Sequence, residues 1–170
     1  MLSEVDLSHL RRAIHLAKMA REHGNHPFGA LLAGAEGEVL AEAENSVVTD
    51  QDCTAHAELN LVRLASRRYD IDTLAGSTLF SSTEPCAMCA GAIHWSGIGR
   101  VVYALSEEHL YQLTGNDPAD RPLKLPCREV FARCARSIET VGPALEAEAE
   151  QVHRGFWRPS ASFADAVIPG

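Results

Sequence analysis

Residues 84–93 read EPCAMCAGAI, and residues 54–58, nearer the N-terminus, read TAHAE. Residues three apart are neighbours on a helix surface, so the thiols of Cys86 and Cys89 can bind one ion from a single first turn. His56 and Glu58 are two apart, which places them about 200° apart around a regular helix. Both can reach one centre only where a helix begins. The spacing therefore predicts two helix starts that meet at one metal centre.

Outward from these motifs, apolar periodicity and turn residues predict alternating helices and strands. Helices are expected at 6–23, 55–66, from 85 to Gly97 or Gly99, 106–113, 127–134 and 143–156, and strands at 29–33, 39–43, 78–81, 100–105 and 137–141. This order predicts an α/β fold with three α/β/α layers, in which a five-stranded mixed sheet carries helices on both faces. We expect a single domain over residues 1–158 and a C-terminal tail over 159–170.

Composition and charge narrow the class of substrate. The 170 residues are 46% hydrophobic and 22% charged, which is typical of one globular domain. The net charge of -8 disfavours nucleic acid, because phosphate binding draws on Lys and Arg, so a small-molecule substrate is expected. Residues 1–10 lack the basic start of a signal peptide, and no apolar run could span a bilayer. We therefore expect a cytoplasmic protein without a membrane partner, whose five cysteines serve as thiols or ligands.

Zinc is the metal that the motif residues indicate. His56, Cys86 and Cys89 would supply three protein ligands to Zn²⁺ and leave the fourth tetrahedral position for water, as in catalytic sites. Glu58 would then move protons between that water and the substrate. A CxxC pair alone also suits a redox pair or half of a structural zinc site. The remaining cysteines show no paired spacing that would complete a closed site.

From Asn25 to about Leu105 the chain resembles the cytidine deaminase superfamily, in the branch that contains guanine deaminases and tRNA adenosine deaminases. The resemblance rests on residues 27–30, on Asn45, and on the two motifs, which combine H-x-E with P-C-x-x-C. It implies a cytidine deaminase-like fold, hydrolytic release of ammonia from an amino-substituted ring, and a homodimer that builds its pocket jointly.

The resemblance also implies residues that contact the substrate. Asn45 corresponds to an asparagine that hydrogen-bonds the base, and Phe28 to an aromatic residue beside it. Trp95 matches a tryptophan of guanine deaminases and is expected in the pocket or at a dimer contact. The backbone N–H of Ala57 would contact the substrate, and Asp117 is the nearest candidate for the acidic recognition residue of guanine deaminases.

We expect a zinc-dependent hydrolytic deaminase of a free nucleobase, with guanine first. Cytosine or a nucleoside is one alternative substrate. Deamination of adenosine in tRNA is another, although a final helix with Glu146, Glu148 and Glu150 is a poor surface for tRNA. A zinc-stabilised module without catalysis is the alternative outside enzymology, and Glu58 discriminates it, because metal binding does not require that residue.

Overall fold

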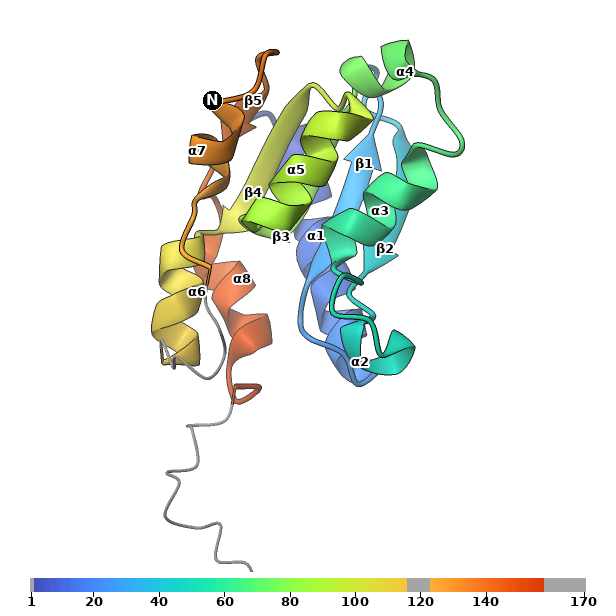
Figure 1. Ribbon diagram of the computed structural model, residues 1–170. Helices are drawn as coiled ribbons and strands as arrows, with labels where there is room; N and C mark the ends of the chain where they lie inside the picture. The colour runs from blue at the N-terminus through green and yellow to red at the C-terminus, as the bar shows by residue number, and fades with distance from the viewer. Residues whose placement is uncertain (1, 116–122, 158–170) are drawn as a thin grey trace, which may run out of the picture.

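The computed structural model describes residues 2–115 and 123–157 of the chain, and a five-stranded sheet forms its centre (Figure 1). Its strands are β1 (Gly29–Ala33), β2 (Val39–Glu44), β3 (Thr78–Thr83), β4 (Arg100–Leu105) and β5 (Glu139–Val141). They lie in the order β2-β1-β3-β4-β5. β1 pairs antiparallel with β2 and β3, whereas β3, β4 and β5 are parallel. The predicted mixed sheet of five strands is confirmed.

Helices cover both faces of the sheet. They are α1 (Glu4–Glu22), α2 (Val47–Asp50), α3 (Ala57–Ala65), α4 (Ile71–Ala75), α5 (Ala87–Ser96), α6 (Glu107–Thr114), α7 (Cys127–Phe131) and α8 (Glu146–His153). α1 and α8 contact each other and β4, while α3 and α5 pack together on the opposite face, with α7 beside α5 (Figure 1). The predicted three-layer arrangement is confirmed. The predicted tail, 159–170, lies outside the described residues, and its boundary at 158 stays a prediction.

Strand β1 shows why both faces need helices. Its five residues are all buried, with Leu31 and Ala33 in the core beneath α1 and with Ala30 and Leu32 in the core beneath α3 and α5. A strand covered on both faces reads as a continuous apolar run rather than an alternating one. The side chain is missing at Gly29, where a Cβ would meet the backbone of α1. α1 can therefore pack closely against the start of this strand.

The largest difference from the sequence prediction concerns short helices. α2 and α4 were not predicted, because helices of four and five residues are too short to show an apolar period. The last three predicted elements are shorter in the structure than in the prediction, by two or three residues at one or both ends. α5 ends at Gly97 in the left-handed region (φ 90°), which fits the predicted stop. No helix within the described ranges has the length and apolar character needed to cross a bilayer.

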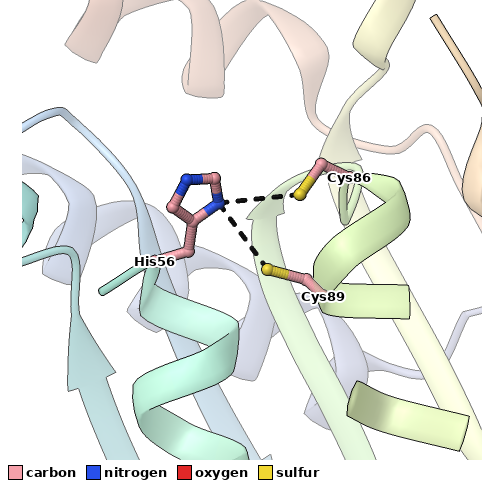
Figure 2. A group of neighbouring side chains, drawn as sticks. All are labelled: His56, Cys86 and Cys89. Atoms are coloured by element: carbon pink, nitrogen blue, oxygen red, sulfur yellow. Dashed lines mark hydrogen bonds between the residues drawn. The ribbon is translucent and has the colours of Figure 1, made fainter. Parts of the chain in front are cut away.

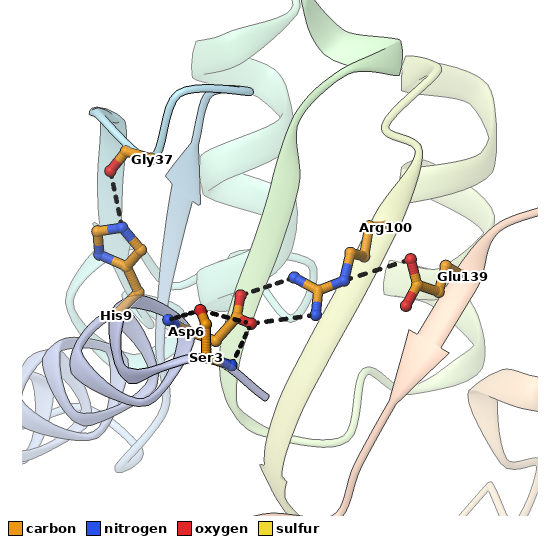
Figure 3. A network of polar contacts seen from close by, with 6 residues as sticks. All are labelled: Ser3, Asp6, His9, Gly37, Arg100 and Glu139. Carbon is orange, nitrogen blue, oxygen red and sulfur yellow. Dashed lines mark hydrogen bonds and ion pairs between the residues drawn. The ribbon is translucent and has the colours of Figure 1, made fainter. Parts of the chain in front are cut away.

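A polar network fastens the start of α1 to the sheet (Figure 3). The hydroxyl of Ser3 accepts from the Asp6 N–H, and the Asp6 carboxylate accepts from the Ser3 N–H, which forms a capping box. Arg100, at the start of β4, donates to Asp6 at 2.7 Å, and its Nε lies 3.4 Å from the Glu139 carboxylate of β5. His9 Nε2 lies 2.8 Å from a carbonyl oxygen in the β1–β2 turn. The network therefore ties α1 to β4, to β5 and to the β1–β2 turn at one end of the sheet.

Candidate active site

The two sequence motifs meet at the other end of the sheet, beyond the carboxyl ends of the parallel strands. His56 is the N-cap of α3 (φ -68°, ψ 151°), and Cys86 is the N-cap of α5 (φ -64°, ψ 169°). Extended backbone at both caps brings each side chain ahead of its helix, while Glu58 and Cys89 project from the first turns. The predicted meeting of two helix starts is confirmed.

The three predicted ligands converge in space (Figure 2). Nδ1 of His56 lies 3.6 Å from the sulfur of Cys86 and 3.7 Å from that of Cys89. One ligand atom from each residue lies within 4.8 Å of the others, and within the described residues no fourth His, Cys, Asp or Glu joins the group. One imidazole nitrogen and two sulfurs form a donor set that suits Zn²⁺. These residues fit a zinc ion held by three protein ligands.

The electrostatics of the thiols favour metal binding. The hydrogen bond from the Cys89 thiol, together with His56, lowers the pKa of Cys86 to about 4 although burial opposes the shift. The hydrogen bond with Cys86 raises the pKa of the Cys89 thiol. The hydrogen bond between His56 and Cys86 raises the pKa of His56. One thiolate is thus already favoured, and a helix N-terminus adds to the preference for negative charge.

Glu58 lies against the ligands and is itself held in place. Its Oε1 accepts a hydrogen bond from the Ser81 hydroxyl at 2.9 Å, and the Cys89 thiol lies 3.6 Å from its Oε2. The residue is 5% exposed, and this burial raises the pKa of its carboxyl. A raised pKa makes the carboxyl a better proton acceptor than an ordinary glutamate, which suits a group that transfers protons.

A cavity of about 160 Å³ adjoins the ligands. Its lining residues are Phe28, His56, Glu58, Thr83, Glu84, Cys86, Glu107, Leu110 and Tyr111. Phe28, His56, Glu58 and Cys86 were predicted from the sequence, whereas Thr83, Glu84 and the three residues of α6 were not. Glu84 stands inside the EPCAMC stretch and could have been singled out there. The residues of α6 carry no such local signal.

The predicted substrate contacts have different locations. Phe28 lines the cavity. Asn45 is 1% exposed, and its Oδ1 accepts from the Val47 N–H at 3.1 Å, whereas its Nδ2 has no partner in the described part of the chain. Ala57 opens α3, where backbone N–H groups lack intrahelical partners. Trp95 is 85% exposed on α5 and does not line the cavity. Asp117 lies outside the described residues, so its predicted role stays a prediction.

Comparison with known proteins decides the family. Residues 3–105 match the model described as "Cytidine and deoxycytidylate deaminase zinc-binding region". The chain belongs to this deaminase family. It is 44% identical over 157 residues to a probable cytosine deaminase of Schizosaccharomyces pombe, covering 92% of this chain and 94% of that protein. It is 41% identical over 101 residues to a tRNA-specific adenosine deaminase of Aquifex aeolicus, covering 59% of this chain and 66% of that protein. A guanine deaminase structure from Nitrosomonas europaea matches with a TM-score of 0.71 and 25% identity, covering 91% of this chain and 84% of that one.

Family membership makes this chain a zinc-binding deaminase, because members are hydrolytic enzymes acting on nucleobases or nucleosides. The matched region ends at residue 105, which is the end of β4. The three α6 residues that line the cavity therefore lie beyond it. Features that distinguish one substrate from another are to be sought in these later residues.

Proposed function

We propose that this deaminase hydrolyses the exocyclic amine of a free nucleobase and releases ammonia. The observation that carries the proposal is the placement of Glu58 beside three converged zinc ligands on the wall of a small cavity. A cavity of about 160 Å³ suits a single ring system better than a polynucleotide. A non-catalytic zinc module would have no use for a buried carboxyl at this position.

Different residues bind the metal, transfer protons and contact the ring. Zinc held by His56, Cys86 and Cys89 supplies Lewis acidity, which lowers the pKa of water towards neutrality. Glu58 accepts a proton from the attacking water and passes it to the ring nitrogen, then accepts the second proton from the new hydroxyl group and passes it to the departing amine. Phe28 packs against the ring from the cavity wall.

One side-chain amide and one backbone N–H group are proposed to orient the ring. The unpartnered Nδ2 of Asn45 would donate a hydrogen bond to a carbonyl oxygen of the base. The Ala57 N–H, at the start of α3, offers a second donor. Two donors in fixed positions would hold the amine-bearing carbon towards Glu58.

Two rings are the leading candidates for the substrate. Guanine is the base predicted from the sequence, and similarity to the N. europaea guanine deaminase supports it. Cytosine is favoured by the S. pombe relative, which matches nearly the full length of both chains and therefore includes the residues after 105. Deamination of tRNA has support from the A. aeolicus relative, but that match covers 59% of this chain, and the net charge of -8 opposes phosphate binding.

Steady-state assays of ammonia release test the proposal. The zinc-loaded enzyme should turn over guanine or cytosine faster than adenine, the corresponding nucleosides or a tRNA anticodon stem. Release of ammonia from no free base would refute the proposal. Turnover of tRNA together with a steep fall of tRNA affinity in salt would support the alternative instead.

We further propose that the deaminase forms a homodimer. Trp95 is 85% and Ile71 60% exposed, and both lie near the C-terminal end of α5, where a Cβ at Gly97 would meet Ile71. Exposed apolar groups of this size favour burial against another chain. Light scattering should give twice the chain mass of 18.4 kDa, and Trp95→Glu should shift the species towards the monomer. A wild-type monomer would contradict the proposal.

A further inference from the structure

Glu107, the first residue of α6, is a second buried carboxyl in the active-site cavity. It is 5% exposed and lines the same cavity as His56, Glu58 and Cys86. Its backbone N–H donates to the Glu84 carboxylate at 3.1 Å, which anchors the start of α6 beside the start of α5. Neither the metal site nor the proton transfers described above use this side chain.

Two polar side chains on this part of the wall have few partners or none. Tyr111 donates to Oε1 of Glu107 at 3.0 Å. Burial raises the pKa of Glu107 to about 7, as expected for a carboxyl with little hydrogen bonding. Thr83 is 1% exposed, and its hydroxyl has no partner within the described ranges. Glu84 differs, because both its oxygens already accept backbone N–H groups, from Glu107 and Cys127. Glu107 and Thr83 therefore present unused hydrogen-bonding capacity to the cavity.

The position of α6 indicates which part of a bound ring would meet Glu107. The amine-bearing carbon must face Glu58 and the ligands, which come from α3 and α5. In Figure 1, α6 lies beside the start of α5 on the side away from α3. In cytosine the ring N–H at N1 lies across the ring from the amine-bearing carbon C4. In guanine the N9–H belongs to the ring farther from C2. In both bases this nitrogen carries the ribose of the nucleoside.

We propose that Glu107 selects free bases over nucleosides by accepting a hydrogen bond from this ring N–H. The inference rests on the proposed function, because it concerns the same site and reaction. A nucleoside lacks the donor, so it would leave the buried Glu107 carboxylate with Tyr111 as its side-chain partner and without a hydrogen bond from the ring, and it would place its ribose against Leu110 and Tyr111. Sites built to hydrogen-bond a substrate reject analogues that lack the donor by up to about 10⁵-fold.

The sharpest probe removes the N–H without adding a sugar. For whichever base the wild-type enzyme deaminates, kcat/KM is compared with that of 1-methylcytosine or 9-methylguanine. The wild type should favour the unmethylated base by about 100-fold or more. Glu107→Leu removes the acceptor and should reduce this preference to less than about fivefold, chiefly by slowing turnover of the unmethylated base.

Two variants separate recognition from a structural effect. Glu107→Gln keeps an acceptor oxygen and should retain most of the preference. Glu108→Leu makes the same change one residue later, at an exposed side chain outside the active-site cavity, and should leave the preference at the wild-type value. Zinc content and thermal unfolding are measured for each variant. A merely structural role for Glu107 would slow both substrates equally and leave their ratio unchanged.

The possible failures are distinguishable. If the wild type deaminates a free base but accepts its N-methyl analogue within about threefold, the role of Glu107 is refuted and the proposed function stands. The same holds if folded, zinc-loaded Glu107→Leu keeps the full preference. If Glu107→Leu does not fold, a Glu107→Gln enzyme that loses the preference while keeping its zinc would overturn the role. Absence of turnover for every free base would overturn the proposed function, and this inference with it.

Discussion

The two ends of the sheet hold carboxyl groups in opposite electrostatic states. At the end where β4 begins, Asp6 pairs with Arg100, and that hydrogen bond lowers the pKa of Asp6 to about 2. At the end where α3 and α5 begin, burial raises the pKa of Glu58 and of Glu107. A partnered carboxylate stabilises the fold, whereas one with too few partners lowers stability unless a ligand supplies them. Under-partnered groups in a cavity are therefore marks of a functional site.

Removal of a metal ligand, at the end of the sheet where α3 and α5 begin, should have the largest effect. Cys89→Ala replaces a fully buried sulfur and leaves two protein ligands, so the variant should lose stoichiometric zinc. We expect no measurable turnover and a lower unfolding temperature, because zinc binding energy is also folding energy. Metal analysis, ammonia release and thermal unfolding check this.

Cys53→Ala is the matched control, because Cys53 is exposed and lies outside the ligand group. It should keep full zinc content and activity. Loss of zinc from this control, or retention of zinc by Cys89→Ala, would contradict the ligand set.

Glu58→Gln should separate catalysis from metal binding. The amide keeps the shape of the side chain but cannot carry protons, so kcat should fall by about 10² to 10⁴-fold. Zinc content should remain at the wild-type value, because Glu58 is not part of the ligand group. Normal turnover by a zinc-loaded variant would remove Glu58 from the mechanism and revive the non-catalytic alternative.

The active site also shows which features could be predicted from the sequence and which could not. The ligand triad and Glu58 were predicted because the two motifs together resemble those of zinc deaminases, and the spacing within each motif added that two helix starts meet there. The mixed sheet was predicted because turn residues bound the strands and the strands alternate with helices along the chain. Glu107 and Tyr111 were missed, because residues of an ordinary amphipathic helix reach the cavity only through the placement of α6 after β4. That placement depends on the hydrogen bond that the Glu107 N–H donates to the Glu84 carboxylate, and no sequence periodicity indicates this tertiary contact.

Two buried asparagines allow the same comparison at smaller scale. The Oδ1 of Asn25 accepts from the Val48 and Thr49 N–H groups, while the Nδ2 of Asn45 lacks a partner in the described residues. Asn45→Ala should lower kcat/KM by about 10 to 100-fold, the effect of one lost hydrogen bond of about 1.4 to 3 kcal/mol. Asn25→Ala should lower stability and leave kcat/KM per bound zinc nearly unchanged. Equal kinetic effects of the two changes would contradict the role of Asn45.

The smallest effect is expected at the end of the sheet where Asp6 pairs with Arg100, and there Asp6→Asn tests stability alone. The folded pKa of Asp6, about 2, lies below its ordinary value of 3.8, so the pair stabilises the fold fully above pH 3.8 and loses this contribution as pH falls through 2. The variant should lose about 1 to 2 kcal/mol of unfolding free energy at pH 7, and this difference should vanish near pH 2. Glu139→Gln alters the other carboxylate beside Arg100, but its side chain is 65% exposed, so solvent screening should make the loss much smaller. Denaturant unfolding at several pH values checks both changes, and neither should alter kcat, because the network lies at the end of the sheet remote from the zinc ligands.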